Sequence, residues 1–350
     1  MKKITALLLA LFMLVGALAG CGKQNDTNKT DKLSIVTTIF PEYDWVREIL
    51  GDKADNAEIT MLLDNGVDLH SYQPTADDIV KISDCDLFIY VGGESDGWVE
   101  DALRNAANRN MKVINLLEVL GDSVKTEEIV EGMQEEEHEH EDAHAHDDAE
   151  EHEHEDAEEH EHEDAEEHEH EEEADEHVWL SLKNAKMLVR VISKALQELD
   201  PDNKDIYAAN ADAYVKKLSA LDAEYQAAVD AASNKTILFG DRFPFRYLVD
   251  DYGLRYYAAF VGCSAETEAS FETISFLAKR VDEWKLPCVL TIEGAQHKIA
   301  ETIVQNTTAK NQRVLTMDSM QSTTTQDVKN GTTYLSVMEK NLSVLKEALR

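Results

Sequence analysis

The chain has 350 residues, 30% of them charged, and a formal net charge of −38. The 26 acidic residues between Glu135 and Glu176 account for about two thirds of this charge, so the rest of the chain is only mildly acidic. The balance excludes nucleic acid as a partner, because proteins that bind a phosphate backbone present a basic surface.

The N-terminus has the layout of a secretory signal. Lys2 and Lys3 precede an uncharged apolar run from Ile4 to Gly20. An uncleaved membrane helix is the alternative, but the run is slightly short for a span, which takes about 20 residues. The segment Leu-Ala-Gly-Cys that ends at Cys21 resembles the lipobox of bacterial lipoproteins, which implies cleavage before Cys21 and a lipid on its sulfur. We therefore expect a signal peptide over 1–20 and a polar, lipid-anchored tether over 21–32.

Strands and helices alternate over 33–134, which we interpret as an N-terminal lobe. The expected strands are 33–38, 57–63, 87–91 and 113–115, and the expected helices are 42–50, 77–83 and 98–108. Such alternation is typical of a parallel sheet with helices on both faces.

The segment 135–176 is a repeat of His, Glu, Asp and Ala, in which we expect disorder because no apolar residue larger than Ala is present. Imidazoles and carboxylates are ligands of divalent metals, so we interpret the segment as a metal-binding loop. The alternative is a solvated acidic tract with incidental histidines. The ten histidines of the loop are His138, His140, His144, His146, His152, His154, His160, His162, His168 and His170.

A zinc-protease pattern, H-E-x-x-H, begins at His140. It needs a packed helix to place both histidines on one face, and a low-complexity repeat does not provide one. We therefore do not interpret the pattern as a catalytic site.

Helical patterns resume after the loop and lead into a second alternation. The expected order is the end of the N-terminal lobe over 177–200, a long linking helix over 201–235, and a C-terminal lobe over 236–350 with strands at 236–239, 255–260, 289–292 and 313–317 and a last helix at 333–349. The predicted fold class is α/β, with two lobes that each contain a parallel four-stranded sheet flanked by helices. Ligands of such sheets bind beyond the carboxyl ends of the strands, which places the expected site in the cleft between the lobes.

Four residues that follow strand or loop ends are the candidate metal ligands: His70, His177, Asp241 and Asp318. Two imidazoles and two carboxylates, two from each half of the chain, suit a divalent cation held between lobes. Each residue also has a simpler interpretation. His70 could be a surface histidine, His177 the last histidine of the tract, Asp241 an ion-pair partner of Arg242, and Asp318 a helix cap.

Two further residues and two cysteines complete the candidates. Glu293 and His297 are reserve ligands, and His297 reads more simply as a residue on a helix surface. In an oxidising compartment Cys263 and Cys288 are the pair that we would join in a disulfide, although spacing does not fix a pairing and buried free thiols are the alternative.

The chain resembles the metal-binding solute receptors of bacterial ABC importers, which take up zinc or manganese. The resemblance depends on the order of several segments, IVTTIFPEYDWVREI, GVDLHSYQPTADDI, LFIYVGGESDGWVE, EHVWLSLKNAKML, AETEAS and VLTMD. It implies that His70, His177, Asp241 and Asp318 hold the metal. It also implies a lipid-anchored, extracytoplasmic monomer that delivers its metal to an ABC permease, with little hinge motion about a long helix.

The metal is not fixed by these ligands. Zinc receptors of this class usually carry His at the position of Asp241 and manganese receptors carry Glu, and carboxylates favour harder metals such as manganese. The His-rich loop favours Zn²⁺, so we expect a zinc receptor, with a manganese or iron receptor as the alternative. An adhesin with a structural metal is a further alternative. An enzyme is not expected, because four protein ligands leave no open position on the metal.

Overall fold

The computed structural model describes residues 32–134, 173–264, 268–294 and 297–350. Contacts separate residues 1–32 from a single unit, Leu33–Arg350, which holds every described helix and strand. The expected signal peptide, Cys21 and nearly all of the tether lie outside the described residues. Among the residues that are described, no helix has the length and apolar character needed to cross a membrane.

The N-terminal half of the unit alternates strands with short helices, as the sequence predicted. Its elements are β1 (Leu33–Thr37), α2 (Phe40–Leu50), β2 (Ala57–Met61), α3 (Ala76–Asp84), β3 (Leu87–Tyr90), α4 (Val99–Arg104), β4 (Lys112–Asn115) and α5 (Leu116–Leu120). Two long helices follow, α6 (Leu182–Leu199) and α7 (Lys204–Ala231).

The C-terminal half repeats the alternation. Its elements are β5 (Thr236–Phe243), α8 (Arg246–Tyr252), β6 (Arg255–Val261), α9 (Phe271–Trp284), β7 (Cys288–Thr291), α10 (Lys298–Asn306), β8 (Arg313–Thr316), α11 (Thr325–Lys329) and α12 (Tyr334–Ala348).

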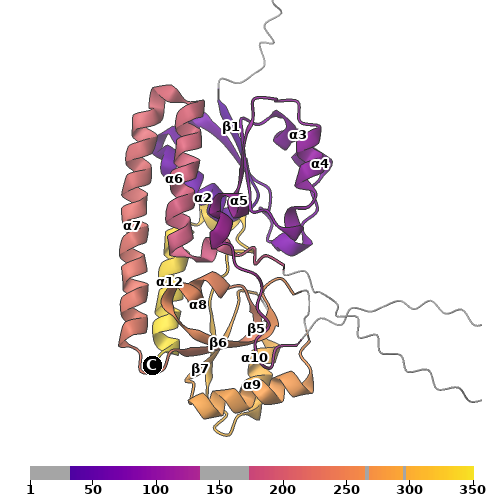
Figure 1. Cartoon of the computed structure of the whole chain (residues 1–350), viewed down its shortest axis with the longest axis vertical. Coiled ribbons are helices and arrows are strands. Elements are labelled where there is room, and N and C mark those ends of the chain that lie inside the picture. The colour runs from indigo at the N-terminus through magenta and orange to yellow at the C-terminus, as the bar shows by residue number, and fades with distance from the viewer. Residues whose placement is uncertain (1–31, 135–172, 265–267, 295–296) are drawn as a thin grey trace, which may run out of the picture. The chain divides into compact units, whose positions relative to one another are not determined.

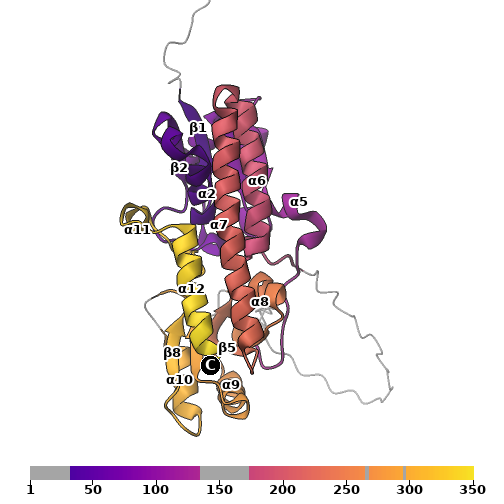
Figure 2. The ribbon, with the colours of Figure 1, turned by 90° about the vertical axis from the view of Figure 1, so that its left-hand side faces the viewer.

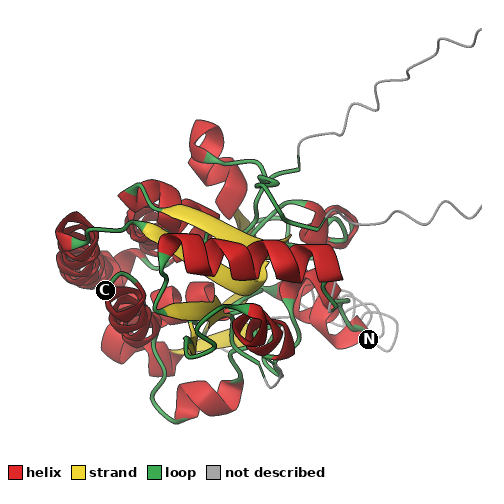
Figure 3. Cartoon of the chain, turned by 90° about the horizontal axis from the view of Figure 1, so that it is seen from below, coloured by secondary structure: helices red, strands yellow, loops and turns green. Residues whose placement is uncertain are grey.

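Each half builds one parallel four-stranded sheet. The strand orders are β2-β1-β3-β4 and β6-β5-β7-β8, so the two halves have the same topology. Helices lie on both sides of the strands (Figure 3). The predicted fold class, with two parallel sheets and a long helix between the lobes, is confirmed.

The long helix α7 contacts both halves. Near its start, Asn210 Nδ2 donates to the Ile49 carbonyl in α2 at 3.0 Å. Near its end, the Tyr225 hydroxyl donates to the Met338 carbonyl in α12 at 2.6 Å. Figures 1 and 2 show α7 beside α6 and α12. The described bounds of the linking helix are shorter than the predicted 201–235.

The main apolar core is continuous through both sheets. Buried side chains of β1, β3, α6, α7, β5 and α12 belong to one cluster, and a smaller cluster lies among β6, α9 and α10. The long helices therefore join the two halves by packing as well as by covalent connection. The candidate site lies in loops that follow strands of both sheets.

Candidate metal centre

The structure brings two of the predicted ligands together. His70 lies in a short 3₁₀ helix (Leu69–Ser71) beyond β2, and His177 directly precedes the 3₁₀ helix Val178–Leu180. Their Nε2 atoms are 3.2 Å apart, although 107 residues separate them in the sequence. His177 is fully buried and His70 is partly buried.

The His70 ring is oriented by groups of its own half. Its backbone N–H donates to Asp68 Oδ1 at 3.1 Å, which caps the short helix. Its Nδ1 atom lies 2.8 Å from the Ser95 hydroxyl and 3.5 Å from Glu176 Oε2. These oxygens favour the tautomer with the proton on Nδ1, so the Nε2 lone pair is free for a cation.

Asp175 orients the second ring in the same way. Its Oδ1 atom accepts from the His177 backbone N–H at 2.8 Å and lies 3.1 Å from His177 Nδ1. A carboxylate behind an imidazole is the usual support of a metal-ligating histidine, because it fixes the tautomer and raises the basicity of the other nitrogen. The two Nε2 lone pairs therefore converge.

A glutamine side chain lies where the lone pairs meet. Gln321 Nε2 is 2.7 Å from His177 Nε2 and 3.2 Å from His70 Nε2, so its amide can donate to both rings. Sequence reasoning did not select Gln321, because a neutral amide is not among the preferred zinc ligands. The amide holds the rings apart at a spacing close to that of two donors on one metal ion.

Burial keeps His70 in its metal-binding form. Desolvation, followed by the neighbouring His177, lowers the pKa of His70 to about 3, while Asp68 opposes the shift. Neutral imidazole is the form that binds a metal ion. The His70 ring is therefore neutral over a wide pH range.

Asp241 lies inside β5, at a register shift between Phe239 and Arg242, and not beyond the strand end as expected. Its Oδ1 atom accepts from the Arg242 N–H at 2.9 Å, and its Oδ2 atom accepts from the Ile292 N–H at 3.3 Å. Burial is the main cause that raises its pKa. The Arg242 guanidinium donates to Asp68 at 2.7 Å, so its ion-pair partner is in the N-terminal half.

Asp318 follows β8, as predicted. Its Oδ1 atom accepts from the Met320 N–H at 2.8 Å, and burial together with Glu293 raises its pKa to about 6. The reserve candidate Glu293 accepts from Ser319 N–H at 2.6 Å, from the Ser319 hydroxyl at 2.7 Å and from Gln321 N–H at 3.1 Å. Glu293 thus anchors the loop that carries Gln321.

The other reserve candidate, His297, occupies the position before the first turn of α10. His297 lowers the pKa of Asp241, against the larger effect of burial. Neither His297 nor Asp241 belongs to the described group of donors that contains the imidazole pair.

Cys263 is a third donor beside the imidazole pair. A ligand atom of each of His70, His177 and Cys263 lies within 4.8 Å of the others, and neither Asp241 nor Asp318 belongs to this group.

The disulfide considered between Cys263 and Cys288 is wrong, since Cys85, Cys263 and Cys288 are all free thiols. Burial and then Glu127 raise the pKa of the Cys263 thiol.

The end of the predicted disordered loop is ordered, which corrects the boundary at Glu176. Ala174 pairs with Thr126, and Asp175 and Glu176 are each 2% exposed. Both acids support the imidazoles, so they cannot belong to a solvated tract. The ten loop histidines lie outside the described residues.

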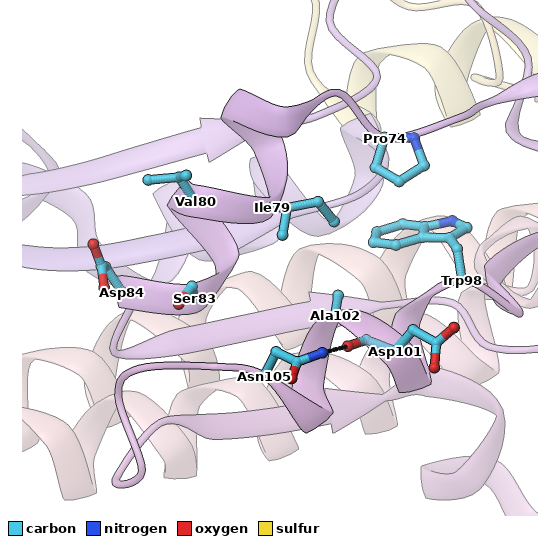
Figure 4. Close-up of a pocket in the computed structure, with 9 residues that line it drawn as sticks. All are labelled: Pro74, Ile79, Val80, Ser83, Asp84, Trp98, Asp101, Ala102 and Asn105. Carbon is cyan, nitrogen blue, oxygen red and sulfur yellow. Dashed lines mark hydrogen bonds between the residues drawn. The ribbon is translucent and has the colours of Figure 1, made fainter.

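A cavity of about 560 Å³ lies between α3 and α4. Pro74, Ile79 and Trp98 form its apolar side, and Asp84 and Asp101 lie at its edge (Figure 4). None of the predicted ligands lines this cavity, so size alone does not identify the metal site.

Comparisons with known proteins agree with a metal site. The family described as zinc-uptake complex component A, periplasmic, matches residues 35–348. The zinc-binding lipoprotein AdcA of Streptococcus pneumoniae is 32% identical over 99% of this chain, which spans 61% of the length of that relative. The high-affinity zinc uptake system protein ZnuA of Bacillus subtilis is 31% identical, over 97% of this chain and 95% of its own.

A solved structure supports the same relationship. The Zn(II)-bound ZnuA-like domain of S. pneumoniae AdcA has a TM-score of 0.65 and 28% identity, and the match covers 91% of this chain and 99% of that domain. The family match covers most of the chain, and the B. subtilis relative is matched over 95% of its length. The chain belongs to the zinc-uptake complex component A family.

Proposed function

We propose that this protein is an extracytoplasmic receptor that captures Zn²⁺ and delivers it to the permease of an ABC importer. The observation that carries the proposal is the convergence of His70 Nε2 and His177 Nε2 at 3.2 Å, each ring being supported on its Nδ1 side by an oxygen. The names of the relatives, which describe zinc binding and zinc uptake, support the same conclusion.

We propose that the protein binds zinc as cargo and is not a metalloenzyme. A catalytic zinc keeps an open position for water beside a general base. Here the nearby acids Asp175 and Glu176 lie behind the imidazoles, on the Nδ1 side, so neither is placed as a general base beside a metal-bound water. Such a buried site fits cargo that is held and released without chemical change.

We also propose that the protein is a monomer held on the membrane by a lipid on Cys21. The His-rich tract then collects zinc close to the receptor site, since its last histidine, His170, is only seven residues from His177 in the sequence. Mn²⁺ is the competing cargo, and the tract together with the imidazole pair favours Zn²⁺.

Calorimetric titration with Zn²⁺ and Mn²⁺ tests the function. The chain from Gly22 onwards is compared with a deletion of 135–172, which spares Asp175 and Glu176 because both support the imidazoles. We expect one tight zinc site that survives the deletion and disappears in His70→Ala. Loss of all tight zinc binding with the deletion, while one manganese site remains, would contradict a zinc receptor.

The carboxylates that the resemblance assigned are tested in the same titration. Asp241→Asn and Asp318→Asn each remove one negative charge with little change of shape. If Asp241 or Asp318 is a ligand, its Asn variant should lose zinc affinity by at least about tenfold. If the residue only holds the backbone, the variant should bind zinc about as tightly as the unchanged chain.

A further inference from the structure

A sulfur atom adds a third donor to the imidazole pair. We propose that the Cys263 thiolate is the third protein ligand of the zinc ion, so that the centre is a His₂Cys site built from His70, His177 and Cys263. The proposal rests on the proposed function, because it assigns a ligand to the same zinc site. Its basis is the approach of the three ligand atoms to within 4.8 Å of one another.

The backbone beside Cys263 is built for close approach to His177. A Cβ atom at Gly262 would lie 3.0 Å from His177 Cε1 and 3.1 Å from His177 Nδ1, so a larger residue would require its neighbours to shift by a few tenths of an ångström. The turn is also fixed from two sides, since Cys263 N–H donates to Glu127 Oε1 at 2.9 Å and Arg242 Nη1 donates to the Ser264 carbonyl at 3.3 Å. The end of β6 is therefore held against the imidazole edge.

The spacing suits a tetrahedral ion. With Zn–N bonds of about 2.0–2.1 Å and Zn–S bonds of about 2.3 Å, neighbouring donors on one ion are separated by roughly 3.3–3.6 Å. The 3.2 Å between the two Nε2 atoms is already close to this value. The ion displaces the Gln321 amide that bridges the rings, and a small movement brings in the sulfur of Cys263.

Asp241 is less suited to the third position. Both of its oxygen atoms accept from backbone N–H groups, of Arg242 and Ile292, and it is absent from the described donor group of the imidazole pair. Arg242, the next residue, ties Asp68 to this part of the chain and thereby supports the turn that carries His70. The register shift of β5 at Asp241 and Arg242 thus supports the site through hydrogen bonds and does not supply one of its three metal ligands.

A thiolate also decides which metal is preferred. Soft sulfur ligands select zinc over manganese, whereas a carboxylate at the same place would favour the harder ion. On binding, the zinc–sulfur bond replaces the S–H bond and the thiol proton is released to solvent, so zinc capture releases one proton from Cys263. The preference for zinc is then built into the site and does not depend on the His-rich tract.

Cobalt substitution tests the sulfur ligand directly. A thiolate on Co²⁺ gives an intense near-ultraviolet charge-transfer band that imidazole and carboxylate ligands do not give. The chain from Gly22 retains only Cys85, Cys263 and Cys288, and the His-rich tract contains no cysteine. We expect one equivalent of Co²⁺ to give the band, Cys263→Ser to remove it and to weaken zinc binding at least tenfold, and the matched control Cys288→Ser to keep both.

Two more variants separate this proposal from the proposed function. Cys263→His supplies an imidazole and should bind zinc more tightly than Cys263→Ser, without the band, provided that circular dichroism shows both to be folded. The proposal is overturned if the band or the affinity persists in Cys263→Ser, or if folded Cys263→His binds no better. Loss of tight binding in His70→Ala but not in Cys263→Ser would leave the receptor function intact, and a wild-type chain without a tight site outside the tract would overturn both.

Discussion

At the scale of single residues, the metal centre depends on groups behind the ligands as much as on the ligands. Asp175 holds His177 through both its backbone N–H and its Nδ1 atom, and Ser95 faces His70 Nδ1. These contacts favour the tautomer with the proton on Nδ1 in both rings. The Nε2 lone pairs then face each other without a bound ion.

Asp175→Asn should therefore lower zinc affinity by about 10–100-fold, because an amide supports the imidazole less strongly than a carboxylate does. Competition with a chromophoric chelator measures the change. The exposed variant Asp52→Asn is the control and should bind like the unchanged chain. An affinity for zinc in Asp175→Asn equal to that of the control would show that the carboxylate is not needed.

The sequence could point to the imidazoles but not to their neighbours. His70 and His177 stand in distinctive segments, and the structure brings their rings together. Asp175 is one of 26 acids in a repeat, and composition does not separate a buried acid from solvated ones. Gln321 and Cys263 depend on long-range contacts between the ends of β8 and β6 and the N-terminal half, which no local pattern encodes.

At the scale of elements, hydrophobic periodicity predicted the strands and the long helices, because their buried faces repeat regularly. Local polar contacts decided the details that were missed. The helical stretch expected after the loop is divided at Ser181, whose hydroxyl accepts from Asn184 N–H and so starts α6. The short helices α5 and α11 have too few residues for a periodic signal.

The buried face of α7 gives a prediction at this scale. Leu218 is fully buried in the core that joins the two halves. Leu218→Ala should lower the free energy of unfolding by about 2–5 kcal/mol, from lost burial and the cavity left behind. Urea unfolding followed by circular dichroism measures it.

Lys216→Ala on the exposed face of the same helix is the control, and its effect should stay within about 0.5 kcal/mol. Equal effects of the two substitutions would mean that α7 does not depend on its packing against the core.

At the scale of the whole molecule, a continuous core limits how far the halves can move. The main cluster contains side chains from both sheets and from α6, α7 and α12. Opening the halves as rigid bodies would expose this apolar surface to water, which is costly. We infer that zinc enters and leaves through movement of the loops that carry His70, Cys263 and Gln321.

Buried acids make the stability of the whole fold depend on pH. Burial, and then the neighbouring Asp96, raise the pKa of Glu42 to about 8. Its Oε2 atom accepts from the N–H and hydroxyl of Thr38, whereas Oε1 has no partner among the described residues. The folded chain therefore favours the protonated acid, and the stabilising contribution is present below about pH 4.5 and is lost as the pH rises to about 8.

Glu42→Gln stays neutral at every pH and should remove this dependence. In zinc-free protein, the stability of the unchanged chain relative to Glu42→Gln should fall with rising pH by at most ~1.4 kcal/mol per pH unit. Denaturant unfolding at several pH values measures the difference. Glu58→Gln, on the surface, is the control. A pH-independent difference between the unchanged chain and Glu42→Gln would contradict the protonated, buried acid.

The most direct test of the metal centre is a crystal structure of the zinc-loaded chain with anomalous diffraction at the zinc edge. We expect a strong peak about 2.0–2.1 Å from both His70 Nε2 and His177 Nε2, with Gln321 displaced from between them. An ordered zinc ion bound instead at Asp241, Glu293 or His297, with the two imidazoles still bridged by Gln321, would contradict it.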